Sequence, residues 1–416
     1  MRVSMHRLQW IHVLAASALI AAASGLTACG SSGSGSSGGS SGGSSESITI
    51  GASMSMTGSL GQFGVDQKAG YDQLVKDINA AGGIDIGGQK RQVSLVTLDN
   101  RSDPNLVTQQ TRQLIVQNGA VAVLASCTPP LVVPGALVAE QQGVPFVSGC
   151  SPVNAFGAAS KTGWKYAWDI FFSEKDQAAQ VAKGLSTPDS NKKVALFTDT
   201  EPDGVVERQL YMEALQAAGL TVVGDYTFPV GTSDFSSFIN DAKSKGAQLV
   251  AGQMIPPDGI ALWKQIKSAS LAPKAAFVAK AAAGQNWKQA LGDVAEGTLS
   301  EVFWTPQTGK ANSDALYNTI KGQFPDPSDQ NLVVMGYTAA AVLADGLKRA
   351  GSTDAAKVNA ALEGTDGDFA GGHVKFDQTH TSTMPYVLMQ WHGEVTVQVV
   401  PPVNGVTFDT PTKGLQ

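Results

Sequence analysis

From residue 47 onward, short runs of apolar and β-branched residues alternate with longer segments in which apolar residues recur every three or four positions. The short runs are typical of buried strands, and the longer segments are typical of amphipathic helices. In the first half of this region the predicted strands are 48–52, 92–98, 121–125 and 144–148. The predicted helices that connect them are 63–80, 104–118 and 130–142. Strands that each lead into a helix predict a parallel sheet with helical crossovers.

The same alternation begins again near residue 193. The predicted strands are here 193–197, 221–228, 249–253 and 275–278, and the predicted helices are 204–218, 235–245 and 258–270. The last segment departs from this order, with helices 332–350 and 353–363 followed by strands 372–376, 386–391 and 395–400. The pattern therefore predicts an α/β protein with two doubly wound parallel-sheet lobes and a tail that crosses back between them.

The first 46 residues have a different character. Arg2 and Arg7 give a positive start before an apolar run over 10–23, which is short for a membrane span but fits the core of a secretory signal. The segment Leu-Thr-Ala-Cys that ends at Cys29 resembles a bacterial lipobox, in which the cysteine thiol accepts a diacylglycerol. We therefore expect a lipoprotein signal peptide at 1–28 and a lipid on Cys29.

Residues 30–45 are all Gly or Ser, and Glu46 follows them. Such a segment cannot bury apolar surface and behaves as a flexible coil with an r.m.s. reach of about 20–25 Å. We predict that 29–46 is a lipidated cysteine with a tether. The tether would hold the folded part at the outer face of a bacterial cell membrane.

Composition excludes several classes of protein. Apolar residues make up 43% of the 416 residues and charged residues 15%, so the chain can bury a sizeable core and is not disordered as a whole. The net charge of −6 argues against binding of nucleic acid, which normally requires a basic face. Three cysteines are too few for a disulfide scaffold or a four-cysteine zinc site.

The sequence offers no catalytic motif. The expected mature chain keeps the histidines His373, His380 and His392. Their spacing fits no zinc motif, and no phosphate-binding glycine motif follows a predicted strand. No histidine is placed to activate Ser126, Ser151 or Cys127 as a nucleophile. We therefore expect a protein that is not an enzyme and that holds no metal and no cofactor.

In open parallel sheets a ligand lies beyond the carboxyl ends of the strands, where loops meet helix N-termini. This rule selects the loops 55–63, 126–130, 148–152, 199–204, 253–258 and 279–286. The second and third of these loops are rich in small hydroxylated residues, and free backbone N–H groups there would suit a carboxylate. Ordinary helix capping is the alternative role of their serines.

Two cysteines follow adjacent predicted strands at the same edge of the first sheet, namely Cys127 and Cys150. An extracytoplasmic location permits a disulfide between them. We predict this disulfide, which would stabilise the fold by about 3 kcal/mol in the chain-entropy model and would stiffen both loops.

Seven short segments of the chain carry a family resemblance. They are 50–58 (IGASMSMTG), 78–84 (INAAGGI), 98–100 (LDN), 142–145 (QGVP), 233–235 (SDF), 295–297 (AEG) and 336–337 (GY). In order and spacing the chain resembles the type I periplasmic binding proteins, in particular the branched-chain amino acid-binding group of ABC-transporter solute receptors. The resemblance covers nearly everything after the predicted tether. It implies two α/β lobes joined by three hinge crossings near 168–172, 302–304 and 385–387.

The resemblance implies two lobes that close on a ligand. The N-terminal lobe would comprise 47–169 plus 304–385, and the C-terminal lobe 170–303 plus 386–416. Four aromatic residues gather near the first crossing, namely Trp164, Trp168, Phe171 and Phe172. We expect hinge packing for most of them, whereas one or two that line the cleft would favour a flat or branched apolar ligand.

In this family, hydroxyls and backbone amides after the third and fourth strands hold the ligand carboxylate. The resemblance carries this role to Ser126, Cys127, Thr128, Cys150 and Ser151. Phe63 takes the position of a tryptophan that packs on the substrate side chain in the amino acid binders. A core position on its own helix is the alternative for Phe63.

The other lobe departs from the family pattern. Amino acid binders hold the ligand ammonium with an acidic residue after the strand 275–278, where this chain has Lys280. Two tyrosines that they supply correspond here to Asp203 and Ile255. Either Asp203 takes the cation, or the ligand has no ammonium and Lys280 meets an anionic or polar group of the ligand. A solvated surface position of Lys280 is a third interpretation.

The resemblance implies an extracytoplasmic, lipid-anchored solute-binding receptor of an ABC importer. It would bind an amino acid or a related small carboxylate between the lobes. Its partners would be this ligand, the membrane permease of the importer, and the membrane itself through Cys29, and we expect a monomer. A tethered small-molecule sensor of the same fold, which feeds a signalling partner, is the alternative, and a hydrolase is a further one.

Overall fold

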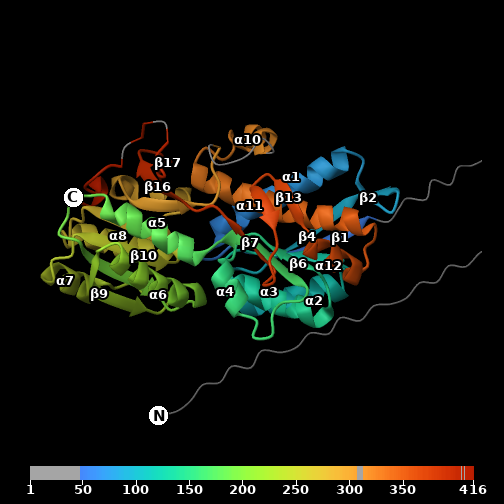
Figure 1. Cartoon of the computed structure of the whole chain (residues 1–416), viewed down its shortest axis with the longest axis horizontal. Helices are drawn as coiled ribbons and strands as arrows, with labels where there is room; N and C mark the ends of the chain where they lie inside the picture. Colours follow the sequence, from blue (N-terminus) through green and yellow to red (C-terminus); the bar gives the residue numbers. More distant parts are fainter. Residues whose placement is uncertain (1–46, 307–312, 404, 407) are drawn as a thin grey trace, which may run out of the picture. The chain divides into compact units, whose positions relative to one another are not determined.

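The computed structural model of the protein describes residues 47–306, 313–403, 405–406 and 408–416. These residues belong to one compact unit (Figure 1). The predicted signal peptide, Cys29 and the predicted tether lie outside the described residues. Within the described ranges, no helix has the length and apolar character that crossing a bilayer requires.

The first of two large sheets contains six parallel strands in the order β15-β7-β6-β5-β1-β4. They are β1 (Ile48–Met54), β4 (Val93–Asp99), β5 (Ala122–Leu124), β6 (Phe146–Ser148), β7 (Ala167–Phe172) and β15 (Thr381–Met384). The helices between the early strands are α1 (Gly61–Ala80), α2 (Pro104–Val116), α3 (Pro129–Gln142) and α4 (Val153–Ala158). Every residue of β5, β6 and β7 is buried, which explains their mainly apolar character; Ser148 and Asp169 are the polar residues in these strands.

The second sheet contains seven strands in the order β17-β16-β12-β11-β10-β8-β9. The parallel strands are β8 (Lys193–Asp199), β9 (Thr221–Phe228), β10 (Leu249–Met254), β11 (Ala275–Lys280) and β12 (Leu299–Val302). The antiparallel strands are β16 (Val387–His392) and β17 (Val395–Val400). The helices of this part are α5 (Glu174–Ser186), α6 (Pro202–Ala217), α7 (Ser236–Ser244), α8 (Pro256–Ser268) and α9 (Gln285–Leu291).

Within the described residues, the chain passes between the two sheets three times. After β7 it enters α5, which packs on α6 and β16 of the second sheet. After β12 it leads to α10 (Asp314–Ile320) and α11 (Pro327–Ala350), and α11 lies along α1 (Figure 1). Between β15 and β16 it returns to the second sheet. The predicted fold class, two doubly wound lobes joined by three crossings, is thereby confirmed.

The remaining elements are α12 (Ala355–Glu363) and the hairpins β2 (Ile84–Ile86) with β3 (Gln89–Arg91) and β13 (Asp366–Phe369) with β14 (Gly372–Lys375). The strands β9 and β17 have the predicted bounds. The sequence analysis missed the hairpin of β2 and β3, because three-residue strands carry too short a pattern to be recognised.

The predicted start of α11 is wrong by five residues. The helix begins at Pro327 and not at residue 332. Asp326 caps it, because the Asp326 carboxylate accepts a hydrogen bond from the backbone N–H of Ser328 at 2.7 Å. Proline fits the first helical position, because its missing N–H would be unbonded there in any case.

Glycine is required where α1 and α11 meet. A Cβ atom at Gly70 would lie 2.0 Å from the carbonyl oxygen of Val333, and a Cβ atom at Gly336 would lie 2.2 Å from that of Gln67. Any larger side chain would therefore push the two helices apart. This close packing brings the first turns of both helices to the cavity described next.

Candidate functional site

A cavity with an empty volume of about 470 Å³ is lined by residues that follow strands of both sheets. This volume includes open solvent at the mouth of the cavity. Six of the nine predicted ligand-binding residues line it, namely Phe63, Cys127, Thr128, Cys150, Asp203 and Lys280. The cavity therefore joins candidates that lie more than 200 positions apart in the sequence.

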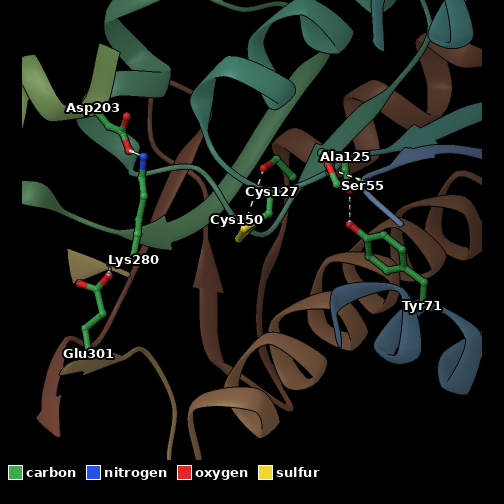
Figure 2. Close-up of a disulfide and its surroundings, with 10 residues drawn as sticks. Ser55, Tyr71, Ala125, Cys127, Cys150, Asp203, Lys280 and Glu301 are labelled. Carbon is green, nitrogen blue, oxygen red and sulfur yellow. Dashed lines mark hydrogen bonds and ion pairs between the residues drawn. A yellow bond between two sulfur atoms is a disulfide. The ribbon is translucent and has the colours of Figure 1, made fainter. Parts of the chain in front are cut away.

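Cys127 and Cys150 form a disulfide whose Cα atoms lie 4.7 Å apart (Figure 2). It ties the loop after β5 to the loop after β6, and both cysteines face the cavity. The backbone N–H of Thr128 also donates to the carbonyl oxygen of Cys150 at 2.8 Å. On the other side, the Tyr71 hydroxyl donates to the carbonyl oxygen of Ala125 at 2.8 Å (Figure 2). The two loops are thus fixed from several directions.

Few backbone N–H groups at the start of α3 are free to bind a ligand anion. The N–H of Thr128 is bonded to Cys150, and α3 begins with Pro129 and Pro130, which have no N–H groups. The hydroxyl of Thr128 is buried and has no hydrogen-bond partner among the described residues. On this wall, side-chain hydroxyls are therefore the groups that remain for a ligand.

The other three predicted residues do not line the cavity. Ser126 is buried and accepts a hydrogen bond from the backbone N–H of Ser55 at 3.3 Å, so it holds the loop after β1. Ser151 is fully buried, and its hydroxyl has no partner among the described residues. Ile255 is buried in the hydrophobic core just before α8.

Lys280 lies at the end of β11, and its ammonium contacts two carboxylates. Its Nζ atom lies 2.7 Å from Oδ2 of Asp203 and 2.8 Å from Oε2 of Glu201. Burial alone would lower the pKa of Lys280, but Asp203, Glu201 and Asp199 raise it well above its ordinary value. Lys280 is 8% exposed, so the interpretation as a solvated surface lysine is wrong. Asp203 and Lys280 neutralise each other.

Glu301 on β12 fixes the backbone of Lys280. Its carboxylate accepts hydrogen bonds from the backbone N–H of Lys280 at 2.9 Å, the hydroxyl of Tyr386 at 2.7 Å and the side-chain amide of Gln177 at 3.0 Å. Figure 2 shows Lys280 extending from Glu301 at its backbone to Asp203 at its ammonium. Sequence reasoning missed Glu301, although an acid within the apolar strand Leu299–Val302 is an unusual signal.

Glu207 is a second acid that sequence reasoning missed. It lies on α6 one turn after Asp203, lines the cavity and is 2% exposed. Its Oε2 atom accepts a hydrogen bond from the Tyr211 hydroxyl at 3.3 Å. Burial, together with the nearby carboxyls of Asp203 and Glu301, raises the pKa of Glu207 well above its ordinary value. The four-residue spacing of Asp203, Glu207 and Tyr211 on one helical face was the available signal.

An aromatic wall faces these charged groups. Its members in the cavity lining are Phe63, Phe171, Phe172 and Phe303. The Phe303 ring centroid lies 4.6 Å from that of Phe172, in a stacked arrangement, and 4.3 Å from that of Phe171. Such contacts hold the rings rigidly and present an apolar surface to the cavity.

The aromatic cluster expected at the first crossing is divided between two places. Phe171 and Phe172 line the cavity. Trp164 stacks on Phe156, and Trp168 stacks on His380, and neither tryptophan lines the cavity. Two of the four residues therefore line the cavity and two pack elsewhere, so packing away from the cleft holds for half of them and not for most.

The first turn of α11 completes the lining with Ser328, Asn331 and Leu332. The Asn331 side-chain oxygen accepts a hydrogen bond from the backbone N–H of Phe303 at 2.8 Å, which fixes the aromatic wall. Sequence reasoning missed Ser328 and Asn331, because it started this helix at residue 332.

Comparison with known proteins places the chain in a class. The sequence profile of the family described as periplasmic binding protein matches residues 47–394. The chain belongs to the periplasmic binding protein family. Together with the Leu/Ile/Val-binding relatives and the LivK and LivJ structures reported below, this match confirms the resemblance to the type I, branched-chain amino acid ABC-transporter kind.

Two relatives align with most of the chain. The leucine-, isoleucine-, valine-, threonine- and alanine-binding protein of Pseudomonas aeruginosa is 25% identical over 353 residues, which cover 84% of this chain and 91% of that protein. The Leu/Ile/Val-binding protein homolog 3 of Brucella melitensis biotype 1 is 27% identical over 348 residues, which cover 83% of this chain and 91% of that protein.

Solved structures show the same fold. The leucine-binding protein LivK of Thermotoga maritima has a TM-score of 0.75 at 21% identity, covering 84% of this chain and 97% of that chain. The binding protein LivJ of Streptococcus pneumoniae in complex with isoleucine has a TM-score of 0.73 at 20% identity, and the match covers 85% of this chain and 99% of that chain. A solute-binding protein of R. palustris in complex with benzoate has a TM-score of 0.70 at 19% identity, and the match covers 85% of this chain and 95% of that chain.

Proposed function

We propose that this protein is the extracytoplasmic solute-binding receptor of an ABC importer. Its ligand is an amino acid or a related small carboxylate with an apolar body. The observation that carries this proposal is the cavity itself, in which an aromatic wall of Phe63, Phe171, Phe172 and Phe303 faces the charged residues of α6 and β11. An apolar lining with a few polar groups is typical of sites that select a small molecule by shape.

The printed names of similar proteins support a carboxylate. The relatives are named as binders of leucine, isoleucine, valine, threonine and alanine, and the similar structures hold isoleucine or benzoate. All of these compounds combine a carboxylate with a compact body. We propose that the carboxylate meets the hydroxyl of Thr128, which lines the cavity, and that of Ser151, which would turn into the cavity when the ligand binds. Neither hydroxyl has a hydrogen-bond partner among the described residues.

We further propose that the lobes 47–169 plus 304–385 and 170–303 plus 386–416 close on the ligand, and that the closed form docks on the membrane permease. A lipid on Cys29 and the Gly/Ser tether would keep this receptor near the permease.

The test is to identify what the protein carries. Mass spectrometry of small molecules released from the purified protein should find a compound with a carboxylate and an apolar body. Adding that compound should raise the melting temperature, because a ligand that binds only the folded form stabilises it, and the compound should be recovered unchanged. Deletion of the gene should abolish its uptake. Normal uptake would favour the sensor, and chemical conversion of the compound would contradict the receptor function.

A further inference from the structure

Carboxyl groups outnumber ammonium groups on the charged wall of the cavity. Among the described residues that line it, Asp203, Glu207 and Glu301 carry carboxyls and Lys280 carries an ammonium. A fourth carboxylate, Glu201, also contacts the Lys280 ammonium at 2.8 Å. Buried carboxylates are stable only when they are paired, hydrogen-bonded or protonated. The bonding of each of these groups therefore decides which one is left for a ligand.

Two of the three lining carboxyls already have strong partners. Asp203 forms the ion pair with Lys280, with 2.7 Å between Oδ2 and Nζ. Glu301 accepts three hydrogen bonds, from Lys280, Tyr386 and Gln177. A ligand could engage Glu301 only by displacing these partners. Asp203 has one oxygen, Oδ1, without a partner among the described residues, but a ligand bound there would share the carboxylate with Lys280.

Glu207 differs from both. It receives one long hydrogen bond, from the Tyr211 hydroxyl to Oε2 at 3.3 Å, and its other oxygen has no partner among the described residues. It is 2% exposed and lines the cavity. Within the described part of the chain, Glu207 is therefore a buried acid in the cavity lining that has no ion-pair partner at hydrogen-bond distance and a single long hydrogen bond.

We propose that Glu207 binds a cationic nitrogen of the ligand, and that the ligand therefore carries an ammonium or amidinium group beside its apolar body, an inference that rests on the receptor function proposed above. The acid expected at the end of β11 is replaced by Lys280, whose ammonium neutralises Asp203. Helix α6 supplies the carboxylate for the ligand instead, one turn further along. The nitrogen would be attracted by the surrounding carboxyls, whereas a ligand with a carboxylate alone would add to the excess of acid.

Binding of a cationic ligand at Glu207 should release a proton from its carboxyl group. The groups around Glu207 are Asp203 and Tyr211 on α6, Glu174 on α5, Lys280 on β11, Glu301 on β12 and Tyr386 before β16. Burial and the acids among these groups raise the pKa of Glu207 well above its ordinary value, whereas Lys280 lowers it. A cation favours the ionised carboxylate and drives the proton out. Affinity for a cationic ligand should therefore rise with pH, by up to about tenfold per unit.

The experiment uses matched sets of probes. L-leucine is compared with 4-methylpentanoate, which lacks the ammonium, and with 3-methylbutylamine, which lacks the carboxylate. L-phenylalanine, 3-phenylpropanoate and 2-phenylethylamine form a second set with a larger body. Isothermal titration calorimetry in phosphate and in Tris, whose ionisation enthalpies differ, gives both the Kd and the number of protons released. We expect the ammonium compounds to bind more tightly than the acids and to release up to one proton each.

Glu207→Gln keeps the shape of the side chain and removes its charge. We expect it to weaken binding of the ammonium compounds at least tenfold and to abolish proton release, with little change for the acids. Glu213→Gln, at an exposed position of the same helix, is the matched control and should behave as the wild type. The proton count of the unmutated protein tests the same assignment without any variant.

The outcomes separate the two proposals. Acids that bind as tightly as the ammonium compounds, or ammonium compounds that bind Glu207→Gln as tightly as the wild type, would overturn the role of Glu207 and leave the receptor function standing. Binding of ammonium compounds without proton release would contradict only the raised pKa. If none of the six probes binds and no small molecule copurifies, the receptor function fails, and the role of Glu207 fails with it.

Discussion

Lys280 shows how a single residue can redefine the chemistry of a site. Its backbone adopts a φ of +56°, a conformation that residues with a side chain rarely use. Such a conformation costs about 1–3 kcal/mol and persists only when the surroundings determine it. Here Glu301 accepts the backbone N–H, and Asp203 and Glu201 hold the ammonium. The side chain is therefore a fixed part of the cavity wall.

We expect Lys280→Met to destabilise the protein by about 3–5 kcal/mol, because it leaves buried acids without their cation. Urea denaturation measures the free energy of unfolding. Lys274→Met, at an exposed position just before the same strand, should change it by less than about 0.5 kcal/mol. Adding Asp203→Asn to Lys280→Met should recover part of the loss. A Lys280→Met protein as stable as the wild type would show that the ion pair does not stabilise the fold.

Two hydroxyls on the opposite wall give a second test at this scale. Combining Thr128→Ala with Ser151→Ala should weaken binding of L-leucine, or of the compound that copurifies, at least tenfold in calorimetry, because the ligand carboxylate would lose its hydroxyl donors. The melting temperature of the unliganded protein should stay near that of the wild type. Thr108→Ala, at an exposed position on α2, serves as the control. An unaltered Kd in the double variant would place the carboxylate elsewhere.

At the scale of elements, the disulfide joins the loops after β5 and β6 across a sequence separation of 23 residues. Replacing both Cys127 and Cys150 by Ala should lower the free energy of unfolding by about 3 kcal/mol, because the unfolded chain gains the freedom that the closed loop denies it. Guanidinium denaturation measures this loss. Thiol counting on the denatured, unreduced protein is the control, since reactive thiols at both positions would contradict the bond.

The contact between α1 and α11 contains two buried acids. Burial raises the pKa of Asp66 to about 8, with a contribution from the nearby Asp329, and burial likewise raises the pKa of Asp329 to about 7. One oxygen of Asp66 accepts a hydrogen bond from Gln62 at 2.8 Å, and the other has no partner among the described residues. The folded protein therefore keeps Asp66 protonated at neutral pH, whereas the unfolded chain ionises it near pH 4.

The free energy of unfolding should depend on pH because of Asp66. Below about pH 4 both states hold the proton, and between about pH 4 and pH 8 only the folded state does, so the free energy of unfolding falls as the pH rises. Asp66→Asn should flatten this slope and gain at least about 1 kcal/mol relative to the wild type between pH 5 and pH 8. Asp72→Asn, at an exposed position of the same helix, should leave the slope unchanged. Parallel pH profiles for wild type and Asp66→Asn in urea denaturation would contradict the raised pKa.

At the scale of the whole folded unit, the cavity is closed by residues from both sides. The backbone N–H of Gln285 in α9 donates to Oδ1 of Asp329 in α11 at 3.2 Å, which links the elements of the two sheets. Movement of the two sides relative to each other would break or form this hydrogen bond. Ligand binding and lobe closure should therefore be coupled.

We expect small-angle X-ray scattering to give a smaller radius of gyration with bound ligand than without it, because the ligand contacts both lobes only in the closed form. A compound that leaves the melting temperature unchanged should also leave the scattering curve unchanged. Superimposable curves with and without a binding compound would show that the lobes do not close on it.

The sequence by itself determined the order of elements and the edge of the sheets where a site would form. Buried strands such as β5 and β10 and amphipathic helices such as α1 can be recognised from the sequence, because their apolar pattern is local. The position of a loop after a parallel strand follows from that order, so Phe63, Cys127, Thr128 and Cys150 could be placed at the cavity in advance.

Only the tertiary structure decided which charges meet. Lys280 and Asp203 are 77 positions apart, and Glu207 is separated from Glu301 by 94, and no local pattern pairs them. Whether a buried acid is bonded or left for a ligand depends on every neighbour that packs around it, since in a low-dielectric interior each partner changes the energy of the charge. Local periodicity therefore specified the framework, and long-range packing specified the chemistry inside it.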